Sequence, residues 1–385
     1  MTESSDVTAS YLNPAKTVVV KVGSALLVED AAGKINASWL MHLAEDLAML
    51  TARGCRCVVV SSGAIALGRR QLGTSAKQQS SRLKLEEKQA AAAIGQVQLA
   101  SEWKIALEKF GLSSAQILLS PDDTETRRKH LNARATLNTL LDCGVIPVVN
   151  ENDTVATMEI RYGDNDRLAA RVAQMISADA LILLSDVDGL YSADPRGQEN
   201  AEHIPLVTAI DDDLRAMAGP ANEAFATGGM VTKIEAGRIA TQAGCHMAIC
   251  AGMALKPITA LMEGGRATWF AAAANPPQAR KTWIAGGLKS KGKLVLDGGA
   301  EIAVTSGKSL LAAGILSVEG DFARGDLVSV CSETSIEVAR GLINYSAEDA
   351  IRIAGHNSSA IQGILGYRGR DEVIHADDLV LNHHK

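Results

Sequence analysis

The sequence lacks the features that mark exported, membrane-spanning and zinc-binding proteins. No apolar run approaches the roughly 18 residues that a helix needs to cross a bilayer, and the N-terminus has neither the basic nor the apolar stretch of a signal peptide. The six cysteines form no CxxC pair and have no histidine at zinc-finger spacing. These absences predict a cytoplasmic protein without membrane contact, whose cysteines are reduced and structural.

Several catalytic motifs are missing as well. There is no GxGxxG for a dinucleotide and no GxSxG for a serine hydrolase. The segment TSGKS at 305–309 is not a Walker A loop, because Ile302 stands where its first glycine should be. The eight histidines follow no catalytic or metal-binding spacing. Dinucleotide-dependent, hydrolytic and P-loop functions therefore lose their main support.

What is present is an ordinary globular composition. The chain has 385 residues, of which 47% are hydrophobic and 21% charged, with a formal net charge of -6. This length favours two domains, one large and one small. The negative net charge does not favour binding to nucleic acid or to an anionic membrane.

The first 265 residues alternate continuously apolar strands with helices, and several of the helices end at a glycine. This pattern predicts an open, mostly parallel α/β sheet sandwiched by helices. We expect strands at 17–22, 57–62, 115–119, 145–150, 180–184 and 246–250, and helices near 40–50, 83–110, 127–142, 167–177, 229–242 and 255–262.

The residue pattern of the sequence changes around 271–285, where a proline pair is typical of a linker or the edge of a domain. Beyond it, KLVLDGGAEIAVTSG has two short apolar runs around Asp-Gly-Gly, and DLVSVCS and AIQGIL are also short runs. These runs predict a small β-rich barrel or sandwich. We therefore expect a catalytic domain over 1–275 and a β-rich domain over 285–375.

Ligands in open α/β sheets bind beyond the carboxyl ends of the strands, so polar residues there are the first candidates. Lys21 ends an apolar strand, a costly place unless it meets an anion, although a lysine can also extend along apolar surface to solvent. A Ser-Ser-Gly turn at 61–63 precedes a helix, whose N-H groups favour a carboxylate or phosphate. Such turns are common, so this second signal alone is weak.

Two more junctions are richer in polar groups. The segment from Asn150 to Arg167 holds NENDTVAT and GDND, whose Asp and Asn side chains could hold the ammonium and carboxylate of an amino acid; the alternative is an ordinary solvated loop. LSDVDGLY is followed by TGGMVTK, where Gly228 and Gly229 open a helix that carries Lys233. Glycines, a helix N-terminus and a lysine together form a cradle for phosphate.

Together, KVGS, SSGAIALG, NENDTVAT, GDND, LSDVDGLY and TGGMVTK resemble, in order and spacing, the glutamate 5-kinases of the amino acid kinase family, over residues from about 16 to 265. The NEND and GDND pair distinguishes this branch from acetylglutamate kinases and aspartokinases. Residues 289–367 resemble a PUA domain, a kind that binds RNA in other proteins. From residue 285 onward, however, 10 Lys and Arg face 13 Asp and Glu, which argues against RNA binding.

The resemblance implies roles residue by residue. It makes Lys21, Lys233 and Asp166 catalytic, with Asp166 as the organising carboxylate between the lysines. It assigns glutamate to Ser62, Asp153 and Asn165. It assigns ATP to Lys21, Ser185, Asp186, Thr227, Gly228, Gly229, Met230, Val231, Thr232 and Lys233. Ser24 and Ser185 stand where threonine is common in relatives, which preserves the hydroxyl.

The implied reaction is in-line transfer of the γ-phosphoryl group of Mg-ATP to the γ-carboxylate of L-glutamate, the first step of proline biosynthesis. No general base is needed, because a carboxylate with a pKa of about 4.3 is already ionised at neutral pH. The cofactors are ATP and Mg²⁺, and we expect few direct protein ligands for the metal.

The resemblance also implies a homo-oligomer, a dimer or tetramer, that proline inhibits. The acyl phosphate product is labile, which favours a partner that captures it, such as glutamate-5-semialdehyde dehydrogenase. Two alternatives stay open: a sister kinase acting on acetylglutamate or aspartate, and a non-catalytic RNA-binding or amino-acid-sensing protein.

Overall fold

The computed structural model describes residues 3–29, 34–72, 83–155, 165–193, 195, 197–198, 200–217, 229–287 and 290–382. The chain divides into two compact units, Met1–Pro276 and Pro277–Lys385. None of the helices within these described ranges is both long and apolar enough to cross a membrane.

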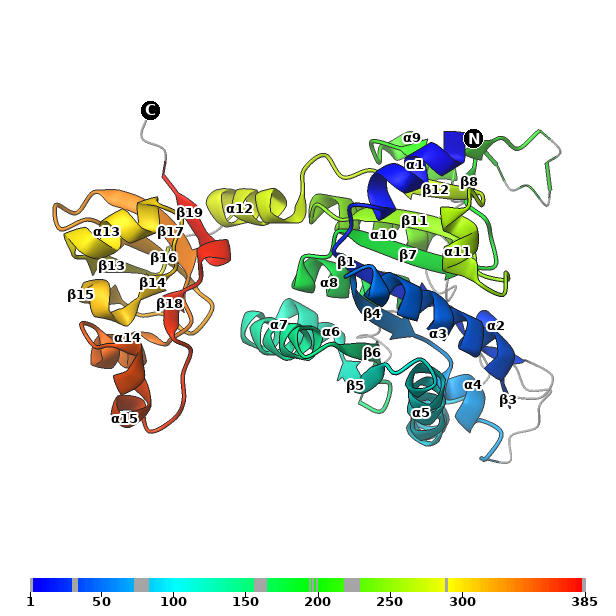
Figure 1. The fold of residues 1–385 in the computed structure, drawn as a ribbon, viewed down its shortest axis with the longest axis horizontal. Helices are drawn as coiled ribbons and strands as arrows, with labels where there is room; N and C mark the ends of the chain where they lie inside the picture. The colour runs from blue at the N-terminus through cyan, green and yellow to red at the C-terminus, as the bar shows by residue number, and fades with distance from the viewer. Residues whose placement is uncertain are drawn as a thin grey trace. The chain divides into compact units, whose positions relative to one another are not determined.

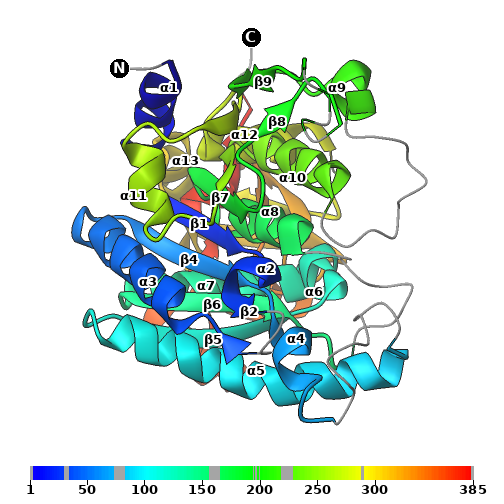
Figure 2. The same cartoon turned by 90° about the vertical axis from the view of Figure 1, so that its right-hand side faces the viewer.

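The first unit is built on one eight-stranded sheet, drawn in Figures 1 and 2. Every pairing in it is parallel except that between β11 and β12. In spatial order the strands are β10 (Leu206–Val207), β12 (Ala267–Phe270), β11 (His246–Ala251), β7 (Ala180–Ser185), β1 (Thr17–Val22), β4 (Arg56–Ser61), β6 (Val145–Glu151) and β5 (Ser113–Leu119). The predicted mostly parallel sheet is confirmed.

Helices cover both faces of this sheet, each over its own hydrophobic core. One face carries α1 (Glu3–Leu12), α3 (Ala37–Ala52), α5 (Leu85–Glu108) and α11 (Pro257–Met262). The other carries α7 (Arg127–Asp142), α8 (Asn165–Ile176) and α10 (Met230–Gln242). Alternate residues of β1 serve the two cores, Val18 and Val20 on the first face and Val19 on the second. Because both faces are buried, β1 is apolar from Val18 to Val20, and the charged Lys21 follows near its carboxyl end.

Local signals explain where helices begin and end. The side chain of Asn36 accepts a hydrogen bond from the Trp39 backbone N-H at 3.1 Å and so caps α3. Gly54 follows that helix with φ +85°, and Gly144 follows α7 with φ +71°. A side chain is strained at such angles, which is why these helices end at glycine.

The shorter elements of this unit lie in its connections. They are α2 (Ser24–Leu27), β2 (Val28–Glu29), β3 (Lys34–Ile35), α4 (Ala64–Gly68), α6 (Pro121–Glu125), β8 (Leu190–Tyr191), β9 (His203–Ile204) and α9 (Asp212–Met217). The proline pair near the division between the units opens a helix, α12 (Pro276–Gly287), because proline fits the first turn of a helix.

Helices α4 and α5 meet backbone to backbone through two glycines. A Cβ atom on Gly68 would lie 1.8 Å from the carbonyl oxygen of Ala91, and one on Gly95 would lie 1.9 Å from that of Ala64. No Cβ tolerates such a distance, so the crossing requires glycine at both positions.

We expect Gly95→Ala to destabilise the protein by about 1–3 kcal/mol or more, because the added methyl must push α4 and α5 apart. Gly298→Ala is the matched control: no atom lies within 4 Å of the position that its added methyl would occupy, and this substitution should change stability by less than about 0.5 kcal/mol. Denaturant unfolding of both variants and the wild type measures the difference. Equal losses in the two variants would contradict this account.

The second unit is β-rich, as predicted. Its five-stranded sheet runs β15 (Ile315–Gly320), β13 (Gly292–Leu296), β16 (Leu327–Cys331), β17 (Glu337–Leu342) and β19 (Leu379–Leu381). A two-stranded sheet pairs β14 (Leu310–Leu311) with β18 (Glu372–Ile374). Apart from α12, the helices described in this unit are α13 (Gly298–Thr305), α14 (Ala347–Ile353) and α15 (Ile361–Leu365), with 3-10 turns at Ala312–Gly314, Ser358–Ala360 and Ala376–Asp378. They share one hydrophobic core with the sheet.

Two of the short apolar runs expected as strands are helices instead. In KLVLDGGAEIAVTSG the first run is β13, but the second lies in α13, because Asp297 caps a helix by accepting from the Ala300 backbone N-H at 2.7 Å. In AIQGIL the residues from Ile361 to Leu365 form α15. Runs of this length do not distinguish a strand from a short buried helix.

Candidate active site

A pocket of about 420 Å³ opens at the carboxyl ends of β1, β4, β6 and β7. These neighbouring strands are parallel, so the residues that follow them meet at the same edge of the sheet. The lining residues are Lys21, Gly23, Ser24, Ala25, Leu26, Ser62, Gly63, Ala64, Ile65, Ala66, Asn150, Glu151, Asp153, Asn165, Leu184, Ser185, Asp186 and Lys233.

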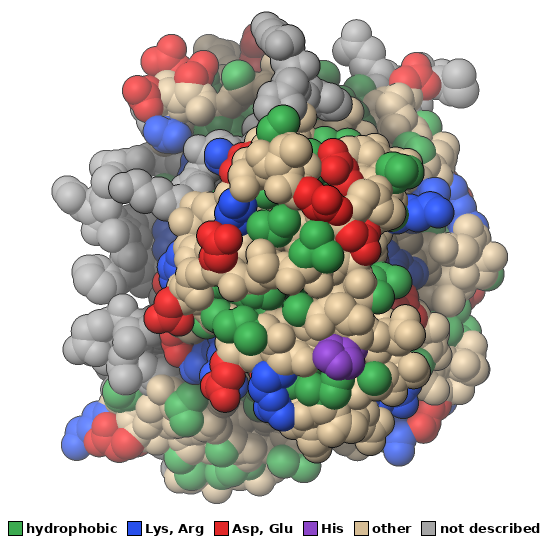
Figure 3. Space-filling model, turned by 90° about the vertical axis from the view of Figure 1, so that its left-hand side faces the viewer, with side chains coloured by type: hydrophobic (Ala, Val, Ile, Leu, Met, Phe, Trp, Pro, Cys, Tyr) green, Lys and Arg blue, Asp and Glu red, His purple; other side chains and the backbone are tan. Residues whose placement is uncertain are grey.

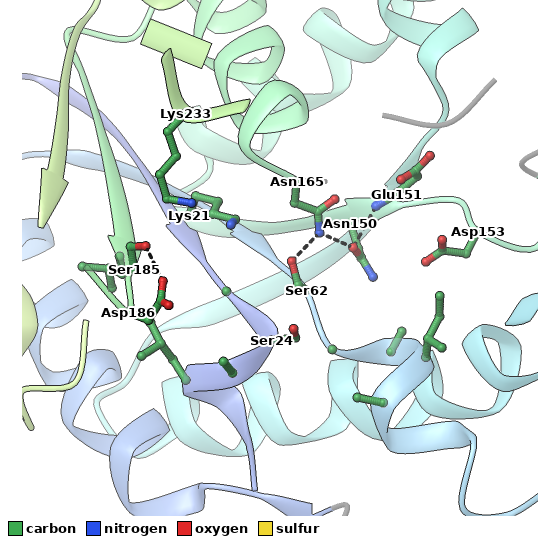
Figure 4. Close-up of a pocket in the computed structure, with 18 residues that line it drawn as sticks. Lys21, Ser24, Ser62, Asn150, Glu151, Asp153, Asn165, Ser185, Asp186 and Lys233 are labelled. Carbon is green, nitrogen blue, oxygen red and sulfur yellow. Dashed lines mark hydrogen bonds between the residues drawn. The ribbon is translucent and has the colours of Figure 1, made fainter. Parts of the chain in front are cut away.

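The pocket has a cationic end and an end rich in amides and carboxylates. In Figure 4, Lys21 and Lys233 lie near each other on one side, Glu151 and Asp153 lie on the other, and Asn165 lies between them. Such a division suits a ligand, or a pair of ligands, with strong negative charge at one end and an ammonium group at the other.

A carboxylate joins the two lysines at the cationic end. Nζ of Lys21 lies 2.5 Å from Oδ1 of Asp166, and Nζ of Lys233 lies 3.1 Å from Oδ2. Lys21 comes from β1, Asp166 from the first turn of α8 and Lys233 from α10, and all three are buried. The hydroxyl of Thr232 donates to the Gly229 carbonyl at 2.7 Å and lies 3.3 Å from Oδ2 of Asp166. One carboxylate therefore fixes ammonium groups from two separate elements.

The charge of Asp166 is maintained by its partners. Burial alone would raise the pKa of this carboxyl, but the charges of Lys21 and Lys233 and their hydrogen bonds outweigh burial and lower it. With one negative and two positive groups, the cluster carries a net charge of about +1 at neutral pH. It is thus suited to meet an anion.

The middle of the pocket is built from interlocked amides. Nδ2 of Asn165, at the start of α8, shares its two hydrogens among three acceptors: the Ser61 carbonyl at 2.9 Å, Oγ of Ser62 at 2.8 Å and Oδ1 of Asn150 at 2.9 Å. Nε1 of Trp103 donates to Oγ of Ser61 at 2.9 Å. These bonds tie the end of β4 to the end of β6 and to α8.

The residues that the sequence pointed to are partly brought together. Lys21, Ser62, Asp153, Asn165, Ser185, Asp186 and Lys233 line one pocket, and Asp166 lies behind it. Oγ of Ser185 donates to Oδ1 of Asp186 at 3.0 Å, where β7 ends.

The TGGMVTK segment is placed only in part. Thr227 and Gly228 fall outside the described residues. Gly229 precedes α10 with an extended backbone, and Val231 is 42% exposed. Of the described residues in this segment, Lys233 alone is among those that line the pocket.

Sequence reasoning left out other contributors to this pocket. Asn150 and Glu151 stood in the polar patch after a strand without an assigned role, yet both line the pocket. Gln96, in the middle of α5, accepts a hydrogen bond from Asn150, and no local motif pointed to it. The strand end was a usable signal for the first two residues, whereas Gln96 offered none.

The sequence model of the amino acid kinase family matches residues 16–251, and that of the PUA domain matches residues 292–365. The chain belongs to the amino acid kinase family. Its relatives include proteins named glutamate 5-kinase from Paramagnetospirillum magneticum, 54% identical over 97% of this chain and 99% of the relative, and from Bradyrhizobium sp., 56% identical over 95% and 96%.

A protein named glutamate 5-kinase 1 from Mesorhizobium japonicum is 54% identical over 96% of both chains. Among solved structures, one titled as an isopentenyl phosphate kinase aligns with 66% of this chain and 99% of its own at 17% identity, with a TM-score of 0.45. That last likeness is too distant to inform the function.

Proposed function

We propose that this protein phosphorylates the γ-carboxylate of L-glutamate with ATP, giving ADP and L-glutamyl 5-phosphate, the first step of proline biosynthesis. The observation that carries the proposal is the Lys21–Asp166–Lys233 cluster at one end of a pocket whose other end holds amides and carboxylates. Its place in a chain more than half identical to proteins named glutamate 5-kinase, over nearly the full length of both, supports the same function.

The two lysines act on the phosphoryl group. In phosphoryl transfer, negative charge spreads over the oxygens of the moving group, and catalysis consists mainly of positioning and of placing cations near those oxygens. Lys21 and Lys233 are buried and already held by Asp166, which orients both. Asp166 is thus the organising group, and the lysines are the groups that touch the reacting atoms.

The acceptor needs only to be held in line. A γ-carboxylate is ionised at neutral pH, so no residue has to remove a proton from it. Ser62 and Asn165 bind glutamate near the ends of β4 and β6, and the carboxylate of Asp153 binds its free ammonium. N-acetylglutamate lacks that charge, and aspartate has one methylene fewer between its ammonium group and its acceptor carboxylate.

The nucleotide lies between the carboxyl end of β7 and the N-terminus of α10. Its contacts come from Lys21, Ser185, Asp186 and the segment Thr227, Gly228, Gly229, Met230, Val231, Thr232 and Lys233, of which Thr227 and Gly228 lie outside the described residues. Support comes from Ser185 and Asp186, which line the same pocket as Lys21 and Lys233.

Magnesium accompanies the nucleotide. Within the described ranges no group of three or more His, Cys, Asp or Glu side chains could hold a metal, and the buried Asp166 already binds two ammonium groups. This donor set fits an ion held chiefly by the phosphates, with Asp186 as a carboxylate available in the pocket wall. When bound, the ion supplies further neutralisation of phosphate charge.

The proposal extends to the rest of the chain and its partners. The catalytic domain spans 1–275 and the PUA-like domain 285–375, and the protein acts in the cytoplasm as a homo-oligomer that proline inhibits. Glutamate-5-semialdehyde dehydrogenase captures the labile product. We expect no binding of RNA, because 10 Lys and Arg face 13 Asp and Glu from residue 285 onward. On the face that Figure 3 draws, Lys and Arg are interspersed with Asp and Glu.

Hydroxylamine converts an acyl phosphate into a hydroxamate and so provides the test. Purified protein with Mg-ATP and hydroxylamine should give hydroxamate with L-glutamate, and at most a small fraction of that rate with N-acetylglutamate or L-aspartate. A higher rate with N-acetylglutamate or L-aspartate would show that this compound, and not glutamate, is the acceptor. No product with any of them, together with tight RNA binding, would favour the non-catalytic alternative.

A further inference from the structure

Gln96 does not line the pocket but reaches the amides that do. It lies in the middle of α5, only 9% exposed, and its Oε1 accepts a hydrogen bond from Nδ2 of Asn150 at 2.8 Å. Asn150 is the next-to-last residue of β6, is 3% exposed and lines the pocket. A side chain 54 residues away along the chain is therefore hydrogen-bonded to the wall of the pocket.

Two backbone groups determine which way the pocket amides point. The Glu151 backbone N-H can only donate, and it donates to Oδ1 of Asn150 at 2.9 Å. The Ser61 carbonyl can only accept, and it accepts from Nδ2 of Asn165 at 2.9 Å. These contacts assign oxygen and nitrogen in both amides without reference to any ligand.

The orientation of Asn150 requires an acceptor at Gln96. With its oxygen turned to the Glu151 N-H and to Asn165, Asn150 must turn Nδ2 toward α5. The Gln96 carbonyl is the group that accepts there, and without it a buried amide donor would have no partner among the residues that the structure describes. Gln96 thereby holds the oxygen of Asn150 toward Asn165.

The same bonds determine what the pocket presents to a ligand. Oγ of Ser62 accepts from Asn165, so its hydroxyl proton is left to donate elsewhere. Nδ2 of Asn165 is engaged by three acceptors, whereas Oδ1 is bonded to no residue in the described part of the chain. One hydroxyl donor and one amide acceptor thus remain, a pair that suits a carboxylate and an ammonium group.

We propose that Gln96 is a positioning residue for the acceptor amino acid: through Asn150 it fixes the orientation of the Asn165 amide, so that Ser62 donates to the substrate and Asn165 accepts from its ammonium group. This inference rests on the proposed function. The neighbouring residue Gly95 sits in the close α4–α5 crossing, which fixes where α5 places Gln96 relative to the loop that carries Ser62.

The test compares Gln96→Met, which keeps the length of the side chain but removes the acceptor, with Gln98→Met on the same helix. Gln98 is half-buried, and no side-chain hydrogen bond holds it to another described residue. We expect Gln96→Met to raise the KM for glutamate about tenfold, the effect of leaving one buried amide unpaired, with the KM for ATP unchanged. Gln98→Met should match the wild type in kcat and in both KM values.

A double-mutant cycle separates positioning from general stability. If Gln96 acts through Asn150, then Gln96→Met should cost little further in a protein that already carries Asn150→Ala. Additive effects in the cycle, or equal rises in the KM for glutamate and for ATP, would overturn the inference. So would Gln96→Met kinetics identical to those of an active wild type. A wild type that forms no hydroxamate with glutamate would instead overturn the proposed function, and this inference with it.

Discussion

Replacing Lys233 with alanine is expected to lower kcat by roughly 10²–10³-fold while the protein stays folded. This range is typical for the loss of one preorganised group that stabilises charge in a transition state. Lys233 is 5% exposed and binds Oδ2 of Asp166, and the variant keeps Lys21 on Oδ1 of the same carboxylate. The Asp166 carboxylate therefore stays paired, which is why we expect the loss in turnover rather than in folding.

The hydroxamate assay at saturating glutamate and ATP measures this prediction, with a thermal melt of each variant. Lys256→Ala is the control: its ammonium pairs with Glu45 at 2.5 Å, and its side chain is 42% exposed. Turnover of that variant should match the wild type. A folded Lys233→Ala protein with normal kcat would remove Lys233 from the catalytic group.

Replacing Asp166 with asparagine should destabilise the protein by about 3–5 kcal/mol, the cost of removing one partner from a buried ion pair. Asp166 is fully buried, and the change removes the negative charge that the two buried ammonium groups share. The control is Asp142→Asn, whose carboxylate pairs with Arg56 at 3.3 Å and is 69% exposed. An exposed pair of that kind contributes about 0–1 kcal/mol.

Denaturant unfolding at several pH values tests the direction in which folding shifts the pKa of Asp166. The pKa of Asp166 is lower in the folded protein than the ordinary value of 3.8. Its ionisation therefore stabilises the fold fully above about pH 4, and this contribution is lost as the pH falls through the folded-state pKa. The stability difference between wild type and Asp166→Asn should shrink in acid. A difference that grows in acid would contradict the assigned direction.

Much of the fold could be predicted from the sequence because one pattern dominates the first unit. Continuous apolar strands alternate with helices that end at glycine, and α7 occupies the predicted range 127–142. The N-terminal helix α1 gave no such signal. It is held by tertiary contacts, including a hydrogen bond of 3.0 Å from Nε1 of Trp269 to Oγ1 of Thr8. Contacts across 261 positions leave no local trace in the sequence.

The second unit shows the limit of local signals more sharply. Asp-Gly-Gly serves equally well as a hairpin turn and as the cap of a helix, and the choice depends on how Asp297 is used. In the pocket, the rule that ligands follow strand ends located Lys21 and Ser62. It could not locate Gln96, because a glutamine inside a long helix looks like any surface residue until the neighbouring strand is placed.

The carboxylate between two lysines has a consequence for the energetics of the ligand-free protein. Burying two ammonium groups side by side costs free energy, because the two charges repel each other and both lose their water. This cost is met when the protein folds, before any ligand binds. When a triphosphate arrives, little solvent or side-chain reorganisation is left to do, which is the condition under which fixed charges lower a barrier most. The free energy spent on burying the two ammonium groups in the resting protein thus contributes to the rate of transfer.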